Sequence, residues 1–191
     1  MRRLFYQMVW LLFFILAAGL TIYSLIDTQD SRDDVYRVDE DELPDELHPT
    51  VENKKNQLLE DASEIGIDVV ITDGIRTIEE QEEIYERGRT KEGQIVTYAE
   101  GGESYHNYGL AVDFALRTEE GRISWNTEAD RNDNGEADWV EVAELAKDLG
   151  FEWGGDWESF QDYPHLQMDF GLSIRELQNG KRPEAEPPEE E

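Results

Sequence analysis

The chain has 191 residues, a net charge of −29 and no cysteine. This length allows one domain with a hydrophobic core, together with an anchor or a tail. The negative charge disfavours nucleic acid and anionic lipid head groups as partners, and the lack of cysteine excludes disulfides, thiolate zinc sites and a cysteine nucleophile.

The N-terminal segment begins with Arg2 and Arg3, and residues 4–26 carry no charge. An apolar run of this length can span a bilayer, and it continues past the small residues 17–19, where a signal peptide could be cut. We predict an uncleaved single-pass anchor over residues 1–26, with a cleaved signal peptide and a secreted protein as the alternative. The arginines favour the cytoplasmic side, which places the rest of the chain outside the cell, facing the wall.

Two acidic segments flank the predicted domain. Residues 27–47 have no apolar periodicity and predict an extended, self-repelling linker. Residues 179–191 are rich in proline and glutamate and predict a disordered tail. The folded domain is therefore predicted over residues 48–178.

Within this domain, apolar spacing predicts a helix over residues 51–65 and another over residues 139–149. A capping-box pattern predicts a third helix, from residue 77 to about residue 87. Strand patterns occur at residues 67–72, 110–116 and 165–170. Helices mixed with strands that are not adjacent in sequence predict an α+β domain.

One carboxylate stands in an otherwise apolar strand pattern. One face of that strand carries Leu110, Val112, Phe114 and Leu116. Asp113 lies on the opposite face, between two alanines that leave room beside it. An ionised carboxylate in a core strand is unfavourable unless it is paired or binds a metal.

Two histidines can join Asp113 at one ion. His106 lies in a loop upstream of it, and His165 opens the last strand pattern, whereas His48 at a predicted helix start is interpreted as structural. Two imidazoles and one carboxylate can hold one zinc ion with a coordination position left open. We predict His106, Asp113 and His165 as ligands and Asp162 as the general base. The same donor set also suits non-haem iron.

Residues 130–141 follow the spacing of a calcium-binding loop, with Gly135 at the sharp turn. The predicted oxygen ligands are the side chains of Asp130, Asn132, Asn134, Asp138 and Glu141 and the carbonyl of Glu136. No clear helix precedes the loop, and Ala137 replaces the usual branched apolar residue. The alternative is an acidic Asn-Gly turn without an ion.

The motif "SYHNYGLAVD" (104–113) fits S-x-H-x-x-G-x-A-x-D, and "DYPH" (162–165) fits [DE]-x-x-H. Together they closely resemble the zinc peptidases of bacterial cell walls, which include D-alanyl-D-alanine carboxypeptidases and dipeptidases and L-alanyl-D-glutamate endopeptidases. The resemblance covers most of residues 48–170. "EEQEEIYERGR" and "LGFEWGGDWESFQDYPHLQM" are most similar to the L-alanyl-D-glutamate branch of Bacillus and phage endolysins.

The resemblance implies a small antiparallel sheet flanked by helices, with zinc in a surface groove. It implies the same ligand roles for His106, Asp113 and His165, and the base role for Asp162, where some members have glutamate. It also implies that Ser104 orients the substrate or the loop.

An arginine follows the first strand in this family and binds an oxygen of the substrate or the transition state, which implies a catalytic and substrate-binding role for Arg76. A fixed guanidinium can bind the free α-carboxylate of D-glutamate beside the scissile bond. The alternative is a salt bridge with a nearby acid such as Glu79 or Glu80.

These observations predict a membrane-anchored, monomeric zinc endopeptidase that hydrolyses the L-Ala–D-Glu bond of peptidoglycan stem peptides. A D-alanyl-D-alanine carboxypeptidase and a non-catalytic wall-binding module are the alternatives. The intact set of ligands and base argues against the binding module, because a binder needs no open metal position.

Overall fold

The computed structural model describes residues 35–39 and 42–184. The predicted anchor, much of the predicted linker and the end of the predicted tail lie outside these residues. Among the helices that are described, none combines the length and the apolar character that a membrane span requires.

The predicted α+β class and the small antiparallel sheet are confirmed. The main sheet has five strands in the order β2-β3-β6-β5, with β4 paired to the far end of β3, and all of its pairs are antiparallel. The strands are β2 (Val69–Asp73), β3 (Ala111–Arg117), β4 (Ile123–Ser124), β5 (Glu152–Trp153) and β6 (His165–Gln167). β3 is central, so both of its neighbours can bring side chains beside those of β3.

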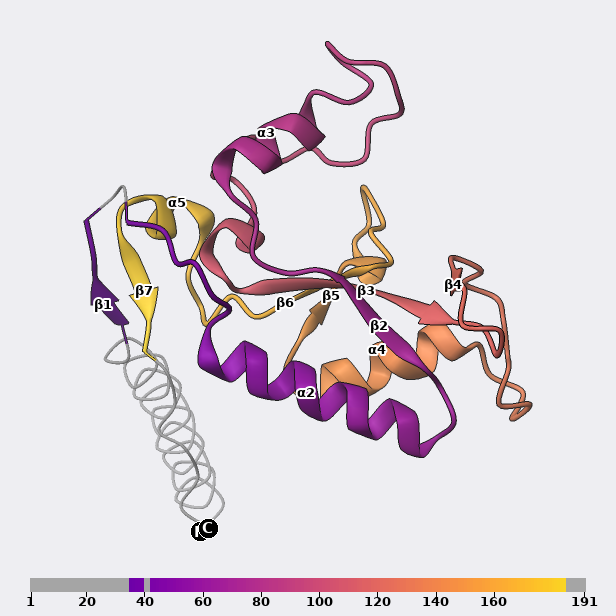
Figure 1. Ribbon diagram of the computed structural model, residues 1–191. Coiled ribbons are helices and arrows are strands. Elements are labelled where there is room, and N and C mark those ends of the chain that lie inside the picture. The colour runs from indigo at the N-terminus through magenta and orange to yellow at the C-terminus, as the bar shows by residue number, and fades with distance from the viewer. Residues whose placement is uncertain (1–34, 40–41, 185–191) are drawn as a thin grey trace, which may run out of the picture.

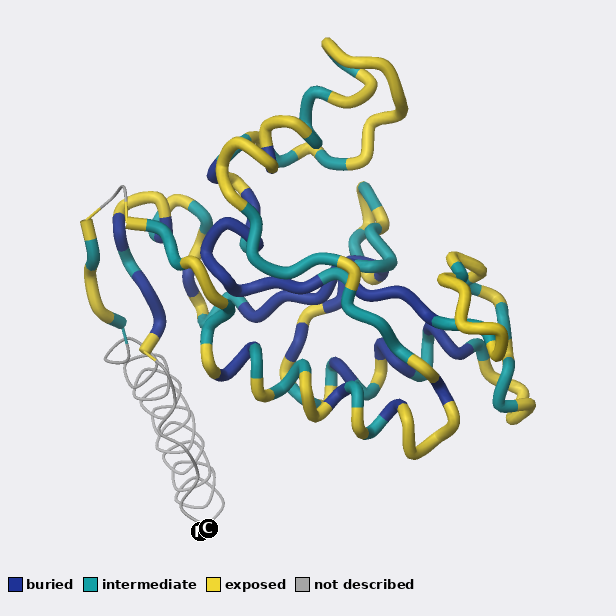
Figure 2. The backbone as a smooth tube through the Cα atoms, in the orientation of Figure 1, coloured by how far each residue is buried: buried dark blue, intermediate teal, exposed yellow. Residues whose placement is uncertain are grey.

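Helices cover one face of this sheet. α2 (Pro49–Glu64) and α4 (Asp138–Asp148) lie under the sheet in Figure 1, and α3 (Ile78–Tyr85) projects from the opposite side. The short turns η1 (Tyr105–Tyr108) and η2 (Gly154–Asp156) precede β3 and follow β5. Figure 2 shows that β3 is buried, whereas the loop after α3 is exposed.

The core explains the alternation along β3. The four large apolar residues of this alternation, from Leu110 just before β3 to Leu116 within it, are all fully buried. Phe114 packs on Trp139 of α4 with ring centroids 4.7 Å apart. Asp113 faces the other side of the sheet, as the sequence pattern predicted, and its side chain keeps 20% of its exposure. The helices thus leave this polar face free for a site.

The fold extends beyond the predicted limits of residues 48–178. β1 (Val35–Arg37) pairs with β7 (Lys181–Pro183) as a separate antiparallel ribbon, next to α5 (Ile174–Gln178). The buried Arg182 donates to the carbonyl oxygens of Glu42 and Leu177. The pairing occurs between segments predicted as linker and tail, because main-chain hydrogen bonds do not require an apolar pattern.

Candidate metal centre

The strands and one tight turn bring the three predicted ligands together. Asp113 on β3 and His165 on β6 are direct cross-strand partners. His106 lies in η1, which Gly109 ends in a left-handed conformation with φ 68°. A side chain at Gly109 would approach the carbonyl oxygen of Glu46 to 2.6 Å, so glycine permits this turn.

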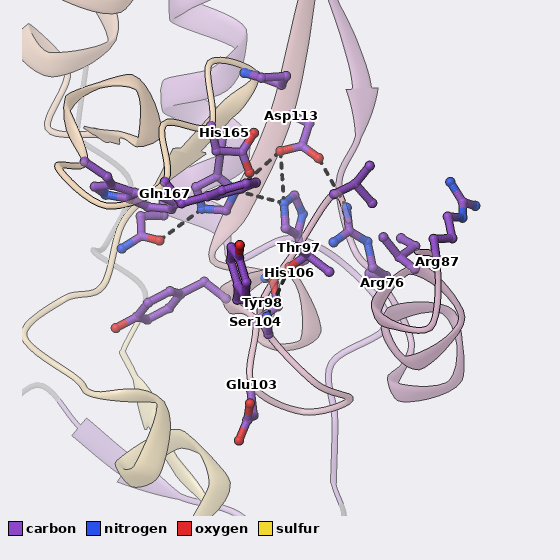
Figure 3. Close-up of a pocket in the computed structure, with 18 of the residues that line it drawn as sticks. Arg76, Arg87, Thr97, Tyr98, Glu103, Ser104, His106, Asp113, His165 and Gln167 are labelled. Atoms are coloured by element: carbon purple, nitrogen blue, oxygen red, sulfur yellow. Dashed lines mark hydrogen bonds and ion pairs between the residues drawn. The ribbon is translucent and has the colours of Figure 1, made fainter. Parts of the chain in front are cut away.

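The ligand atoms form a nearly equilateral triangle (Figure 3). His106 Nε2 lies 3.2 Å from His165 Nδ1, and Asp113 Oδ1 lies 3.2 Å from the first nitrogen and 3.3 Å from the second. Within residues 35–39 and 42–184, this is the group of three metal-ligating side chains whose ligand atoms come within 4.8 Å of one another. A tetrahedral zinc with bonds of about 2.05 Å separates its ligand atoms by about 3.3 Å.

Hydrogen bonds fix which nitrogen of each ring faces the triangle. His106 Nδ1 donates to the Gly74 carbonyl at 2.6 Å, which leaves Nε2 as the lone-pair nitrogen. His165 Nε2 donates to Gln167 Oε1 at 3.0 Å, and the Gln167 amide in turn donates to Glu152 at 2.9 Å. Two lone pairs that face each other at 3.2 Å repel unless a cation or a proton lies between them. The donor set therefore fits a metal ion.

The pKa values of Asp113 and His165 agree with a site that binds a cation. Burial alone would raise the pKa of Asp113, but hydrogen bonds and positive charge from His106 and His165 outweigh it and lower that pKa far below its usual range. Burial would lower the pKa of His165, yet Asp113 outweighs it and raises that pKa above 6.5. Protonation of His165 and binding of zinc would thus compete for the same lone pair.

Arg76 contacts Asp113 at the carboxylate oxygen that does not face the histidines. Its Nη2 donates to Asp73 at 2.6 Å and to Asp113 Oδ2 at 3.2 Å, and its Nη1 donates to Gln81 Oε1 at 2.7 Å. Nε also donates to Asp73 at 3.1 Å. These contacts use all but one of its five N–H groups, and the side chain is 10% exposed. Arg76 therefore holds Asp113 Oδ2 and leaves Oδ1 to the histidines, and its predicted salt-bridge alternative is met by Asp73 rather than by Glu79 or Glu80.

Asp162 lies in the same pocket and is held by its backbone. Its N–H donates to the Gly154 carbonyl at 2.9 Å, and its carbonyl accepts from His165 N at 3.2 Å. A side chain at Gly154 would approach the Asp162 carbonyl oxygen to 2.5 Å, so glycine permits this contact. Burial, followed by the charge of Asp113, raises the pKa of the Asp162 carboxyl. No side chain among the described residues hydrogen-bonds this carboxylate, which leaves it available to a substrate or a water.

Ser104 has a structural contact in the turn that carries His106. Its Oγ accepts from the backbone N–H of His106, and the side chain of Asn107 completes the capping box. Asn107 Nδ2 also donates to the carbonyl of Arg76 at 2.8 Å. These contacts match the loop-orienting role; a contact of Ser104 with substrate stays a prediction.

The pocket has a volume of about 830 Å³, and its walls are rich in aromatic side chains that the sequence interpretation did not identify. Tyr98 and Phe160 meet edge to face, with ring centroids 5.1 Å apart. The ring of Trp157 lies 5.2 Å from that of His165. Tyr98 is 64% exposed and Trp125 is 57% exposed. These rings belong to loops, where the sequence shows no periodic pattern. The one sequence signal that could have identified them as pocket residues is the presence of aromatic residues among glycine and acidic residues.

The predicted calcium loop is only partly assembled. Both Asp130 oxygens accept from backbone N–H groups, those of Asn134 and Gly135. Glu141 accepts from the side-chain amides of Asn132 and Asn134, at 3.1 and 2.6 Å. Asp138 instead forms an ion pair with Arg131 at 2.7 Å, with its side chain 1% exposed. Four of the five predicted side chains therefore form hydrogen bonds with one another or with the loop backbone, whereas Asp138 is held by Arg131.

The sequence has clear relatives. A family model described as D-alanyl-D-alanine carboxypeptidase matches residues 97–168. The peptidoglycan L-alanyl-D-glutamate endopeptidase CwlK of Bacillus subtilis is 60% identical over 126 residues, which cover 66% of this chain and 75% of that protein. The L-alanyl-D-glutamate peptidase of a Listeria phage is 42% identical over 91 residues, or 46% of this chain and 30% of the phage protein. A solved structure, the L-Ala D-Glu endopeptidase ChiX of Serratia marcescens, matches with a TM-score of 0.38 and 21% identity over 65% of this chain and 90% of that one.

Proposed function

Since the chain belongs to the D-alanyl-D-alanine carboxypeptidase family of peptidases, as the family model and the 60% identity with CwlK show, we propose that it is a zinc-dependent peptidoglycan L-alanyl-D-glutamate endopeptidase. One observation carries the chemistry. The lone-pair nitrogens of His106 and His165 and Asp113 Oδ1 converge within 3.3 Å, at a pocket that also contains the carboxylate of Asp162. This arrangement provides a metal site and a nearby base in one groove.

The mechanism assigns a separate task to each side chain. His106, Asp113 and His165 would hold the ion, and a bound zinc would supply Lewis acidity at the scissile carbonyl. Gly74 and Gln167 fix the imidazole tautomers through their hydrogen bonds. Arg76 holds the outer oxygen of Asp113.

Asp162 transfers the proton of the attacking water. Its carboxylate accepts a proton from the attacking water and donates it to the leaving amine of D-glutamate. Its raised pKa suits a group that must hold that proton between the two steps. The ring of Trp157 lies beside that of His165 in the wall of the same pocket. The remaining N–H of Arg76 is available to a substrate oxygen, as the family resemblance implies.

The test is digestion of purified peptidoglycan by the full-length chain, followed by mass spectrometry of the fragments. New N-terminal D-glutamate on the stem peptides supports the endopeptidase. Release of free D-alanine, with stems otherwise intact, would instead support a carboxypeptidase.

Two further proposals concern ions and stoichiometry. We propose one zinc ion per chain, because the described residues contain one group of three ligands of this kind. We also propose that residues 130–141 bind calcium through Asp130, Asn132, Asn134, Glu141 and the Glu136 carbonyl. The ninth position of such loops commonly binds through water, so a displaced Asp138 is compatible with this proposal.

We propose that the enzyme is a monomer anchored in the cell membrane by residues 1–26, with its domain on the outer side. The support is the uncharged run over residues 4–26 and the preceding Arg2 and Arg3. Recovery of the protein in alkali-washed membranes, together with its digestion by external protease in protoplasts, would support the anchor. Recovery in the culture medium, cut near residue 19, would contradict it.

A further inference from the structure

Arg87 is a cation in the wall of the pocket that contains the metal ligands. It lines that pocket and its side chain is exposed. Across residues 35–39 and 42–184, its guanidinium forms no hydrogen bond and no ion pair. Arg76, which lines the same pocket, is held by Asp73, Gln81 and Asp113. Figure 3 shows Arg87 beyond Arg76 as seen from the metal ligands.

The backbone around Arg87 is a fixed turn that follows α3. Its N–H donates to the Ile84 carbonyl, and the N–H of Gly88 donates to the Lys91 carbonyl at 2.9 Å. Gly88 has φ +73°, and a side chain there would come within 2.6 Å of the Ile95 nitrogen. Only glycine suits this position, so the turn presents Arg87 in one orientation of the backbone.

Neighbouring cations are already engaged. Arg89 stacks on Tyr85 at 3.8 Å and donates to the Thr97 carbonyl at 3.0 Å, which braces the loop. Lys91 forms an ion pair with Glu86 at 2.7 Å. Neither lies in the pocket wall. Although the chain has 46 acids against 17 bases, no acidic side chain within residues 35–39 and 42–184 pairs with Arg87 at the pocket.

We propose that Arg87 binds a carboxylate of the stem peptide on the D-glutamate side of the scissile bond. This inference rests on the proposed function. D-Glutamate joins the next residue through its γ-carboxyl, so its α-carboxylate is free, and the stem carries at least one further carboxylate beyond it. Both sources present the same planar anion, which a guanidinium can bind with two hydrogen bonds.

The electrostatics of the chain favour such a contact. A net charge of −29 repels an anionic substrate at long range. The pocket also contains acidic side chains, Glu103 and Asp162 among them. An unpaired guanidinium offsets this repulsion at one place and therefore selects where the carboxylate lies.

The experiment uses three synthetic peptides based on N-acetyl-L-Ala–γ-D-Glu–L-Lys. The first has a free D-Glu α-carboxylate and an amidated C-terminus, the second has D-isoglutamine and a free C-terminus, and the third has both groups amidated. Wild type, Arg87→Gln and Lys91→Gln are compared as zinc-loaded full-length chains. Lys91→Gln makes the same change in net charge outside the pocket and is the matched control.

Arg87→Gln should lower kcat/KM about tenfold on a carboxylate-bearing peptide, the usual size for one charge-assisted contact. The loss should lie in KM, shrink in high salt and vanish on the doubly amidated peptide. The peptide that shows the loss identifies which carboxylate Arg87 binds.

An equal loss on all three peptides, no loss on any of them, or the same loss in Lys91→Gln would overturn the proposal for Arg87. Cleavage of the doubly amidated peptide by wild type establishes the endopeptidase activity without any carboxylate contact. Failure of Arg87 as a binding residue is therefore distinguishable from failure of the proposed function.

Discussion

His106 Nε2 and His165 Nδ1 face each other at 3.2 Å, and each ring donates its other N–H to a fixed acceptor. The acceptors are a backbone carbonyl and an amide that is itself held by Glu152. The chain thus prepares two lone pairs for one cation. The geometry of the metal site therefore depends on the residues that orient the two rings as well as on the three ligands.

Zinc binding should release protons at pH values below the raised pKa of His165. The pKa of His165 is raised above 6.5 because Asp113 outweighs the effect of burial. Without metal, the stability that this proton contributes is fully present below about pH 6.5 and is lost as pH rises through the raised pKa. Zinc affinity should change in the opposite sense and weaken as pH falls through that pKa. Calorimetric titration in two buffers of different ionisation enthalpy measures the release; a buffer-independent binding enthalpy at pH 6.5 would contradict it.

Gln167→Leu should weaken zinc binding about 10- to 100-fold, because loss of such an outer hydrogen bond frees the orientation of the ligand. The variant removes the acceptor of His165 Nε2 but no metal ligand. Gln57→Leu is the control, since Gln57 lies on α2 and its side chain donates to Asp61, far from the metal ligands in sequence. Zinc affinity measured by competition with a chromophoric chelator decides the matter, and equal affinities of the two variants would show that the tautomer is not set by Gln167.

The sequence was sufficient for the two faces of β3, because the alternating apolar side chains that it shows are buried in the structure and Asp113 keeps 20% of its exposure on the other face. It was insufficient for features made by contacts distant in sequence. The β1–β7 ribbon joins two segments without apolar patterns, and its main-chain pairing leaves no signal in composition. The pairing of Asp138 with Arg131 could not be foreseen either, because loop spacing does not reveal which way a carboxylate turns.

Calcium in the millimolar range should raise the melting temperature of the zinc-loaded chain, since a ligand that binds only the native state stabilises it. Glu141→Ala should abolish the shift, because Glu141 already contacts Asn132 and Asn134 in the loop. Glu144→Ala is the control on the same helix, where Glu144 pairs with Lys147. An unchanged melting curve of the wild type in calcium would leave the acidic-turn interpretation.

Asp138→Ala should destabilise the fold by about 3 kcal/mol, because it leaves the Arg131 guanidinium without its buried partner. The loss should persist in calcium, since the ion pair and not an ion holds Asp138 in the structure. Chemical denaturation with and without calcium measures it. A larger loss in calcium than without it would indicate that Asp138 is a ligand after all, because the variant would then also lack the stabilisation that the ion gives the wild type.

Replacement of Asp113 and replacement of Asp162 should both abolish activity, but for different reasons. Asp113→Ala should lose zinc, because two histidines are too few to hold the ion tightly. Asp162→Asn should keep about one zinc per chain and fold normally, while kcat falls by about 10² to 10⁴ through loss of the general base. Asp156→Asn is the control for the second variant, because Asp156 lies in the same segment and pairs with Lys147. Zinc retention and cleavage by Asp113→Ala would show that this carboxylate is only a partner of Arg76.

The most direct measurement is the appearance of new amino termini on purified peptidoglycan, followed by labelling and mass spectrometry. The zinc-loaded chain should produce N-terminal D-glutamate, chelation should stop it, and one equivalent of zinc should restore it. Asp162→Asn loaded with the same zinc should release almost none. Free D-alanine in place of N-terminal D-glutamate, or undiminished cleavage by the chelated chain, would contradict a zinc-dependent L-alanyl-D-glutamate endopeptidase.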